Sequence, residues 1–391
     1  MAVLKNKKII KKPARRGGKV LVKKTSIKKP VRRGRKVVKK ITKKITALNL
    51  ERLKKNPIIE PEDHSYWESK ATFNPSAIIH DGKVHIVYRA IGDSDNSVLG
   101  YAGSNDGFTI SDRFQTPIFF HFIKQNRNSL LPITFYSSGG GCGGGCEDPR
   151  LTLIGDTVYM LYIAFDGWNS IRVALTSISL DDFIAKHWNW KNPVFISPPG
   201  EMRKKWVLFP EKISGPATGG KKKYAIIHSI SPEILIDYFD SLDELDGNNF
   251  IHSIPLEGPI WEKRDPLVRG PGPSPIKTKY GWLILYHKME KHDSHRYKLW
   301  AMITDINNPT KILYNSKSPI LEPDEWYENE GYKSGVIYSC GAVVKDGQLF
   351  VYYGGADKVS CVATANLDKF LNELVHTSVT VMKKDKLKIK I

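Results

Sequence analysis

Apolar residues recur along the chain in five short runs, and each run follows a turn rich in Gly, Asp or Lys. Within a run the apolar positions alternate with polar ones or are continuous, a pattern typical of β-strands. Equivalent positions in successive copies are 58 to 74 residues apart, which is enough chain for a sheet of about four strands. The copies occupy residues 80–90, 154–167, 219–230, 279–289 and 345–357.

A second predicted strand follows each copy and often runs into an acidic turn, as in IRVALTSISLDDF. Five repeats of strand, Gly/Asp turn and strand, without a long amphipathic helix, predict an all-β fold, a five-bladed β-propeller. A β-sandwich with hairpins at coincidental spacing is the alternative. The segment 367–377 has helical spacing and predicts a short helix with Phe370, Leu371 and Leu374 on its apolar face.

The composition favours a folded protein. Of the 391 residues, 41% are hydrophobic and 10% are aromatic, which is enough to build a sizeable core. No run reaches the roughly 18 apolar residues of a membrane-spanning helix, and the N-terminus lacks the apolar stretch of a secretory signal. We therefore expect a cytoplasmic protein, and the four cysteines, too few for a disulfide scaffold, are expected to be reduced.

The chain carries 60 Lys and Arg against 40 Asp and Glu, and the excess lies at the N-terminus. Residues 1–44 contain 20 Lys and Arg and no acidic residue, whereas the remaining chain is formally neutral. We expect a disordered basic tail over residues 1–45 and a folded domain over residues 46–391. Such a density of cations suits a polyanion, either nucleic acid or an anionic lipid surface. The alternative is a solvated tail that only raises solubility or carries an address.

Polar residues end the predicted strands at nearly the same phase of each repeat. Because propeller strands converge on a central channel, we expect these side chains to share one cavity. A ring of cations, imidazoles and carboxylates favours a polar, hydroxyl-rich or anionic ligand, and structural capping of the strands is the alternative. The residues are Arg89, Asp166, His228, His287 and Asp357.

The segment GGGCGGGCEDPR, residues 139–150, brings the acidic pair Glu147 and Asp148 to the second repeat. Its six glycines permit close approach of the backbone. Pro149 restricts the backbone after the pair, and Arg150 is suited to hold a carboxylate or an anionic substrate. The alternatives are a phosphate-binding loop, a Cys-x₃-Cys metal site and a plain turn with a salt bridge.

Two further segments precede later repeats. The stretch FPEK ends in Glu211 and Lys212, an acidic-basic pair before the third repeat. The stretch GPGPSPI, residues 270–276, precedes the fourth repeat. Its prolines make it too rigid for a central strand, so we expect a shaped loop at the rim of the channel.

Together these segments resemble the mannoside phosphorylases and mannosidases of glycoside hydrolase family 130. The resemblance runs in order from about residue 56 to 372. It implies a five-bladed propeller, in agreement with the repeat count, and an enzyme that acts on β-mannosidic bonds with inversion, usually using phosphate to release α-mannose 1-phosphate. The motifs are Asn74-Pro75 with the VYRA that contains Arg89, CEDPR at 146–150, LFPEKI at 208–213, GPGPSPI at 270–276, YSCGAVV at 338–344 and YYGGAD at 352–357.

The resemblance also implies roles for single residues. Asp148 corresponds to the general acid, which in this family protonates the glycosidic oxygen through a sugar hydroxyl. No metal or organic cofactor is implied, and inorganic phosphate is the expected co-substrate. The mannosyl unit is expected to contact Asn74, Arg89 and Asp357. The other candidate substrate-binding residues are Glu147, Arg150, Asp166, Glu211 and Lys212.

Phosphate needs a cationic pocket. The resemblance places His287 and Tyr297 beside phosphate. A lysine that opens the proline-rich loop in the family is replaced here by Val268, but Arg269 is adjacent and residues 203–205 add basic side chains upstream of LFPEK. We therefore count Arg269 among the candidate phosphate-binding residues.

Three functions stay open at this level: phosphorolysis, which the sequence favours, hydrolysis, and glycan binding without catalysis. An inverting hydrolase needs a second carboxylate, roughly 6.5–9.5 Å from the acid, to activate water. The candidates for that base are Glu211, Glu233 and Glu330. The positions of cations around Asp148 distinguish phosphate from water as the acceptor. A β-mannoside oligosaccharide and phosphate are the expected partners, and a homo-oligomer is compatible with the sequence.

Overall fold

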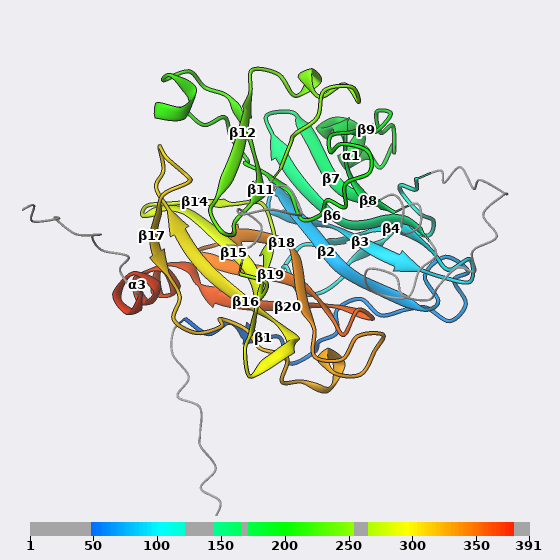
Figure 1. Ribbon diagram of the computed structural model, residues 1–391. Coiled ribbons are helices and arrows are strands. Elements are labelled where there is room, and N and C mark those ends of the chain that lie inside the picture. The colour runs from blue at the N-terminus through cyan, green and yellow to red at the C-terminus, as the bar shows by residue number, and fades with distance from the viewer. Residues whose placement is uncertain (1–47, 122–143, 166–170, 254–264, 379–391) are drawn as a thin grey trace, which may run out of the picture. The chain divides into compact units, whose positions relative to one another are not determined.

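The computed structural model describes residues 48–121, 144–165, 171–253 and 265–378, all within the unit Ile45–Ile391 (Figure 1). Strands make up most of its regular structure, so the all-β prediction is confirmed. The predicted tail, residues 1–45, lies outside the described residues.

The first two repeats form one eight-stranded sheet that consists of two antiparallel groups. Within each group, most strands pair with their neighbours in sequence. A two-residue parallel pairing of Asn96 with Gly144 and of Ser97 with Gly145 joins the groups. The strands are β2 (Ala71–His80), β3 (Lys83–Ile91), β4 (Asn96–Ser104), β5 (Asp112–Arg113), β6 (Gly144–Ile154), β7 (Thr157–Phe165), β8 (Ile171–Ser179) and β9 (Val194–Phe195).

Each of the other three repeats has a sheet of its own, so that five antiparallel groups match the five predicted copies. In the last sheet β1 pairs with β20, and backbone hydrogen bonds thus join the two ends of the domain. The strands are β10 (Val207–Leu208), β11 (Tyr224–Ser229) and β12 (Leu235–Phe239); β13 (Val268–Pro271), β14 (Ile276–Thr278), β15 (Gly281–Glu290), β16 (Asp293–Thr304) and β17 (Ile312–Asn315); β1 (Glu51–Arg52), β18 (Ile337–Lys345), β19 (Gln348–Gly355) and β20 (Val359–Asn366).

Short helices lie between the strands. The predicted C-terminal helix is confirmed as α3 (Leu367–Thr377), and its apolar face is buried. The acidic turn expected after β8 is instead the helix α1 (Leu180–Ala185), because Ser179 caps the amide of Asp182 and acidic residues fill the first turn. Among the described residues, no helix has the length and apolar character that crossing a membrane requires. The 3₁₀ helices are η1 (Pro216–Thr218), η2 (Leu242–Glu244) and η3 (Trp326–Glu328).

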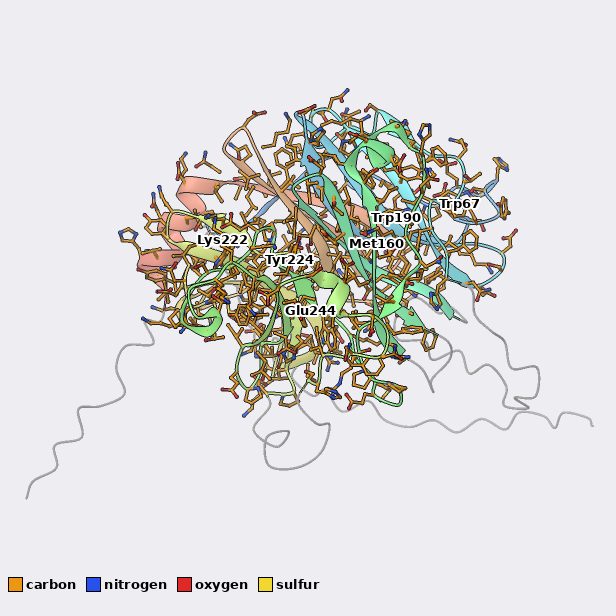
Figure 2. All side chains as sticks on the ribbon, turned by 90° about the horizontal axis from the view of Figure 1, so that it is seen from above. Trp67, Met160, Trp190, Lys222, Tyr224 and Glu244 are labelled. Carbon is orange, nitrogen blue, oxygen red and sulfur yellow. The ribbon has the colours of Figure 1, made fainter. Side chains whose placement is uncertain are left out.

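Side chains fill the spaces between the sheets (Figure 2). The strands that carry the repeat are covered on both faces, and β19 is buried along almost its whole length. Burial on both faces explains why their apolar runs are nearly continuous. One core cluster joins two neighbouring sheets and α3 through Leu285, Leu299, Ile337, Val351 and Phe370.

The proline-rich segment 270–276 differs from the expected loop. Gly270 and Pro271 belong to β13, and Ile276 begins β14; both short strands pair with β15. β13 lies at the edge of its sheet, where proline is tolerated because its missing N–H leaves no ladder hydrogen bond unmade. Only residues 272–275 form a connection of irregular backbone.

Candidate active site

A β-bulge interrupts the first strand of four of the five antiparallel groups. A bulge turns side chains out of the regular alternation, and bulges are common beside functional sites. In β2 and β6 the displaced residues include Asn74 and Asp148. The register shifts lie between Phe73 and Ser76 in β2, Glu147 and Arg150 in β6, Val268 and Gly270 in β13, and Ser339 and Gly341 in β18.

The bulges bring Asn74 and Asp148 together. Nδ2 of Asn74 donates a 2.7 Å hydrogen bond to Oδ1 of Asp148. Both residues precede proline and have a positive φ, 49° and 52°, which Asn and Asp tolerate better than most side chains. Gly354 of β19 makes room for this pair, because a Cβ there would lie 2.4 Å from Oδ1 of Asn74.

Arg89, from the end of β3, holds both members of the acidic pair. Its Nη2 lies 3.0 Å from Oε1 of Glu147, and its Nη1 lies 3.7 Å from Oδ1 of Asp148. Its Nε donates to Oγ of Ser97 at 2.7 Å, and its guanidinium lies 4.6 Å from the ring centroid of Phe73. The side chains of Arg89 and Glu147 are each only 1% exposed. These contacts fix the guanidinium with little freedom to move.

Arg150 contacts the backbone of Asp148, whereas the sequence predicted that it holds either a carboxylate or an anionic substrate. Its Nη1 donates to the backbone carbonyl of Asp148 at 2.9 Å, not to the carboxylate. Its Nε donates to the carbonyl of Gly272 at 3.0 Å, and its Nη2 donates to the hydroxyl of Tyr338 at 3.1 Å. Arg150 thereby ties three different sheets together around Asp148.

Two buried carboxyl groups of the site have opposite pKa shifts. Burial alone raises the pKa of Asp148, but Arg89, Arg150 and the Asn74 hydrogen bond outweigh burial and lower it below the usual value. Asp357, which follows β19, is 4% exposed. Burial raises its pKa to about 6, against the opposing effect of Lys333 and Arg89. The site therefore contains one carboxyl group that ionises easily and one that keeps its proton to higher pH.

Two lysines lie close to Asp148. Burial lowers the pKa of Lys204, while Glu147 and Asp148 oppose that effect. Burial lowers the pKa of Lys205 well below its usual value, and Arg269 and Lys204 lower it further. Like charges at close range disfavour the charged form of each lysine. An anion that binds beside them offsets this repulsion and stabilises their charged forms.

Several cationic side chains lie around Tyr297. Nε of Arg269 donates to its hydroxyl at 2.9 Å. Nζ of Lys333 lies 4.3 Å from its ring centroid, and Nζ of Lys205 lies 5.6 Å from it. We call Lys204, Lys205, Arg269 and Lys333 the cationic cluster; none of the four is fully buried.

The sequence reasoning missed Lys333 and Tyr338. Lys333 lies in a polar segment before the fifth repeat, without a pattern that distinguishes it from a surface lysine. Tyr338 was present in the YSCGAVV motif but was given no role. Its ring lies 5.6 Å from Nζ of Lys205, and its hydroxyl accepts the Arg150 hydrogen bond.

His287 lies behind Tyr338. The two rings are stacked with centroids 4.4 Å apart and planes 4° apart. Nε2 of His287 accepts the backbone N–H of Ser339 at 2.9 Å. Burial, Lys205 and Arg150 hold the pKa of His287 well below its usual value, so the imidazole is neutral. His287 thus packs against Tyr338 as a neutral imidazole, and its place beside phosphate stays a prediction.

Other predicted residues have partners elsewhere. Glu211 is half-exposed and lies 2.6 Å from Nζ of Lys277. Nζ of Lys212 lies 4.3 Å from the ring centroid of Tyr224. His228 contacts Oγ of Ser253 at 3.1 Å. Asp166 lies outside the described residues, and the role of each of these residues in substrate binding stays a prediction.

The cysteines and the groups that could bind a metal were also compared with the sequence predictions. Cys340 and Cys361 are free and buried, as expected of reduced thiols; Cys146 is also buried, and Cys142 lies outside the described residues. Within the described parts of the chain, no group of three or more His, Cys, Asp or Glu side chains could hold a metal ion. The expectation that the chemistry needs no cofactor stays a prediction.

Known proteins resemble this chain along most of its length. A family model for glycoside hydrolase family 130, described as beta-1,4-mannooligosaccharide phosphorylase, matches residues 40–376. The chain is 36% identical to the 1,2-beta-oligomannan phosphorylase of Thermoanaerobacter sp. (strain X514), with 81% of this chain and 97% of the relative covered. It is 31% identical to the beta-1,2-mannobiose phosphorylase of the same organism, with 82% and 98% covered. The structure of Listeria innocua beta-1,2-mannobiose phosphorylase with beta-1,2-mannobiose has the same fold, with a TM-score of 0.58, 24% identity, and 83% of this chain and 99% of that chain covered.

Proposed function

Since the chain belongs to glycoside hydrolase family 130, we propose that it cleaves β-mannosides with inorganic phosphate and inverts the anomeric carbon. The products are α-mannose 1-phosphate and the sugar that was linked to mannose. The observation that carries this proposal is the cationic cluster beside the buried carboxyl of Asp148. Phosphate is an anion that needs such a pocket, whereas water does not.

We also propose that the five antiparallel groups of strands form a five-bladed propeller. Two observations support this arrangement: β1 pairs with β20, and the strands β2, β6 and β18 contact one another. In this arrangement the bulged strand ends face one central site. Asn74, Asp148 and Asp357 then surround the same mannose unit.

In the reaction, an oxygen of phosphate forms the new bond to C1 of mannose on the face opposite the leaving oxygen. The glycosidic C1–O bond breaks, and the leaving oxygen takes a proton that originates from Asp148 and passes through a hydroxyl of the sugar. Asp148 is left as a carboxylate, stabilised by Arg89 and Asn74. Asn74, Arg89 and Asp357 orient the mannose, and Glu147 and Arg150 hold these groups in place.

Phosphate also acts on the protonation of the acid. The low pKa of Asp148 depends on nearby positive charge, including that of Lys204. A bound phosphate brings negative charge close to the carboxyl, and this negative charge raises the pKa of Asp148. The acid is therefore protonated more readily when the nucleophile is bound.

Tyr297 and Arg269 complete the phosphate site, and His287 is a positioning residue that holds Tyr338. Hydrolysis has less support from the structure. Of the predicted bases, Glu211 is paired with Lys277, and Glu330 lines a cavity whose lining does not include Asp148. The location of each carboxylate is thus explained without a role as the base that activates water.

The product of the reaction tests the proposal. The full chain is incubated with β-1,2-mannobiose, β-1,4-mannobiose or mannosyl-glucose in the presence of phosphate, and the products are followed by ³¹P and ¹H NMR. We expect α-mannose 1-phosphate from at least one substrate. Free mannose alone would indicate a hydrolase, and binding without turnover would indicate a non-catalytic glycan-binding protein.

For the basic segment, residues 1–44, we propose binding to a polyanion such as nucleic acid. The 20 Lys and Arg without an acidic residue support this, because phosphate backbones bind such clusters by counterion release. Deletion of residues 1–44 is expected to abolish salt-sensitive retention on DNA and to leave sugar cleavage intact. Retention that persists after the deletion would contradict the proposal. Oligomerisation and a cytoplasmic location stay predictions.

A further inference from the structure

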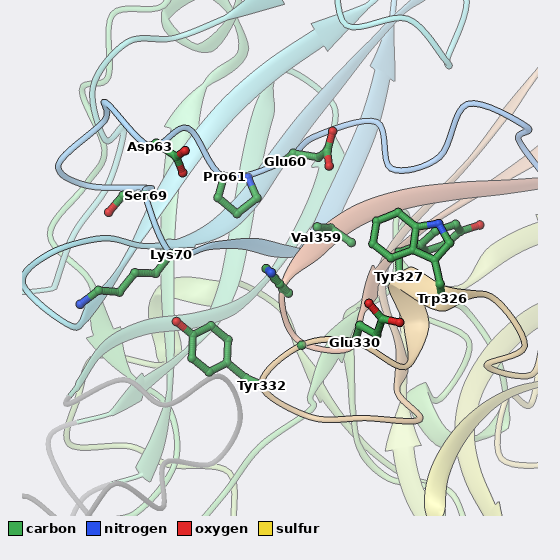
Figure 3. Close-up of a pocket in the computed structure, with 12 residues that line it drawn as sticks. Glu60, Pro61, Asp63, Ser69, Lys70, Trp326, Tyr327, Glu330, Tyr332 and Val359 are labelled. Carbon is green, nitrogen blue, oxygen red and sulfur yellow. The ribbon is translucent and has the colours of Figure 1, made fainter.

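The connection between β17 and β18 carries Lys333 of the cationic cluster. On its exposed side, Trp326 and Tyr332 line a cavity and are 57% and 51% exposed (Figure 3). Side chains that are exposed to this extent do little to anchor a segment. Tyr327 and Glu328 are buried, and Glu328 is 0% exposed. The position of the connection therefore depends on its buried side chains, of which one is a carboxylate.

Five hydrogen bonds hold the carboxylate of Glu328. Arg52 donates two of them, from Nε to Oε1 at 2.7 Å and from Nη2 to Oε2 at 2.9 Å. The hydroxyl of Tyr353 donates to Oε1 at 2.8 Å. The backbone N–H groups of Asp324 and Glu325 donate to Oε2 at 2.8 and 2.9 Å. Since a carboxylate has about four lone-pair sites, this one is saturated by the protein itself.

The partners of Glu328 come from other strands of the fifth sheet. Arg52 belongs to β1 and Tyr353 to β19. Burial lowers the pKa of Arg52, but the hydrogen bond with Glu328 and its negative charge outweigh burial and raise that pKa. Arg52 therefore stays charged. A buried pair of this kind has one preferred geometry, because each charge that loses its partner stays buried and uncompensated.

The main chain of Glu328 leads directly to the cationic cluster. Its carbonyl accepts the backbone N–H of Gly335 at 3.1 Å, and the carbonyl of Gly335 accepts the backbone N–H of Tyr297 at 2.9 Å. Residues 329–334 thus form a loop that is closed at Glu328 and carries Lys333. The cationic side chains lie around the ring of Tyr297, so two groups of the proposed phosphate site are linked to Glu328.

The loop has a second attachment at Lys333 itself. The backbone N–H of Lys333 donates to the carbonyl of Ala356 at 3.0 Å. A Cβ on Gly331 would lie 2.4 Å from that carbonyl oxygen, so only glycine allows this approach. Nζ of Lys333 then lies 4.3 Å from the ring centroid of Tyr297. If the closure at Glu328 loosens, this attachment remains, but the lysine and the ring no longer have a fixed separation.

We propose that Glu328 is a positioning residue for phosphate: its buried carboxylate holds the loop that presents Lys333 beside Tyr297. The inference rests on the proposed function and deepens it, because it assigns part of the phosphate affinity to a residue that does not touch phosphate. Less precise placement of the two groups weakens phosphate binding. Binding of the mannoside at Asp148 changes less. A role in stability alone predicts no such selectivity.

A second buried triad of the chain offers a matched control. Glu68 is 2% exposed, accepts a hydrogen bond from the hydroxyl of Tyr88 at 2.7 Å and lies 2.8 Å from Nη2 of Arg113. It has the same Glu, Arg and Tyr composition as the group around Glu328. In the described part of the chain, its hydrogen bonds and ion pairs do not involve Tyr297. A loss of stability alone affects both triads alike.

The KM for phosphate tests the inference. Initial rates at varied phosphate and saturating β-mannobiose are measured for the parent, Glu328→Gln and Glu68→Gln. We expect Glu328→Gln to raise the KM for phosphate about tenfold and to change kcat at saturating phosphate much less. Glu68→Gln is expected to lower the melting temperature as well but to leave that KM at the parental value. Equal KM values for phosphate in the two variants would overturn the inference.

A milder pair of variants keeps the test decisive if Glu328→Gln does not fold. Tyr353→Phe removes one hydrogen bond of the Glu328 carboxylate, and Tyr88→Phe removes the corresponding bond of Glu68. We expect Tyr353→Phe to raise the KM for phosphate about threefold and Tyr88→Phe to leave it unchanged. A parental KM in Tyr353→Phe would then overturn the inference.

A binding measurement separates this inference from the proposed function. Calorimetry measures the affinity for inorganic phosphate of the parent, Glu328→Gln and Glu68→Gln without mannoside. We expect Glu328→Gln alone to weaken binding, by about tenfold. If the parent shows no phosphorolysis but this difference is found, the proposed function fails and the positioning role stands. If phosphorolysis is found and the three affinities are equal, the positioning role fails alone.

Discussion

Asn74 and Asp148 occupy corresponding bulges in two neighbouring groups of strands, and the amide of the first donates a 2.7 Å hydrogen bond to the carboxylate of the second. Both residues have a positive φ and both precede proline. The same backbone feature, a bulge with a positive φ before proline, therefore occurs in two repeats. It positions an amide in one repeat and a carboxyl group in the other. The pairing fixes the carboxylate before any substrate binds, which is the preorganisation that acid catalysis needs.

Asn74→Ala is expected to shift the pH dependence of catalysis. The Asn74 hydrogen bond helps to lower the pKa of Asp148, so its removal raises that pKa. A general acid must be protonated to act, and the alkaline limb of kcat at saturating phosphate, which reports the phosphate-bound complex, therefore moves to higher pH. Measurement of kcat from pH 3 to pH 9 records the shift. A limb at the parental position would mean that Asp148 is not the acid that this limb reports.

Asp148→Asn is expected to lower turnover at least about a hundredfold, the usual scale of general acid catalysis. The substitution keeps the shape of the side chain and an oxygen that accepts the Asn74 hydrogen bond, so the melting temperature serves as the control for folding. Initial rates with β-mannobiose and phosphate measure the effect. Activity close to that of the parent would refute the assignment.

Lys205→Met is expected to raise the KM for phosphate about tenfold or more, because a hydrogen bond to a charged group contributes about 1.5–3 kcal/mol. The KM for the mannoside is expected to change less. The control is Lys277→Met, which removes an exposed lysine that pairs with Glu211 away from the cationic cluster. Initial rates at varied phosphate separate the two variants. An equal effect of both substitutions would contradict a specific phosphate site.

Asp357 is expected to make folding stability depend on pH. Burial raises its pKa from 3.8 to about 6, so between these values the folded state binds more protons than the unfolded state. Stability is therefore lost as the pH rises through this window, by up to about 3 kcal/mol. Relative to Asp357→Asn, the parent is expected to lose stability between pH 4 and pH 7 in denaturant unfolding. A constant difference between the two proteins would contradict the shift.

The strands and their grouping into five antiparallel sets were largely predictable because the information for them is local. Each repeat has a Gly/Asp turn and an apolar run, and strands buried on both faces preserve that pattern in the sequence. The two places where the prediction differed also have local reasons. Ser179 caps a helix that was expected to be a turn, and Pro271 lies in an edge strand that was expected to be a loop.

The site was predictable only in part. Asp148 and Arg89 lie in recognisable motifs, and the structure places both in the buried cluster. Lys333 and Lys205 come from distant segments whose convergence depends on the tertiary structure. The surroundings of His287 also depend on it, since stacking on Tyr338 and burial keep the imidazole neutral. The resemblance predicted that His287 lies beside phosphate, and that role stays a prediction.

The central claim is that the cationic cluster makes phosphate, and not water, the acceptor. The most direct test is the initial rate of β-mannobiose cleavage as phosphate is increased from zero. We predict no cleavage without phosphate, a rate that saturates as phosphate rises, and one α-mannose 1-phosphate for each bond broken. Release of free mannose at the same rate without phosphate would contradict the account.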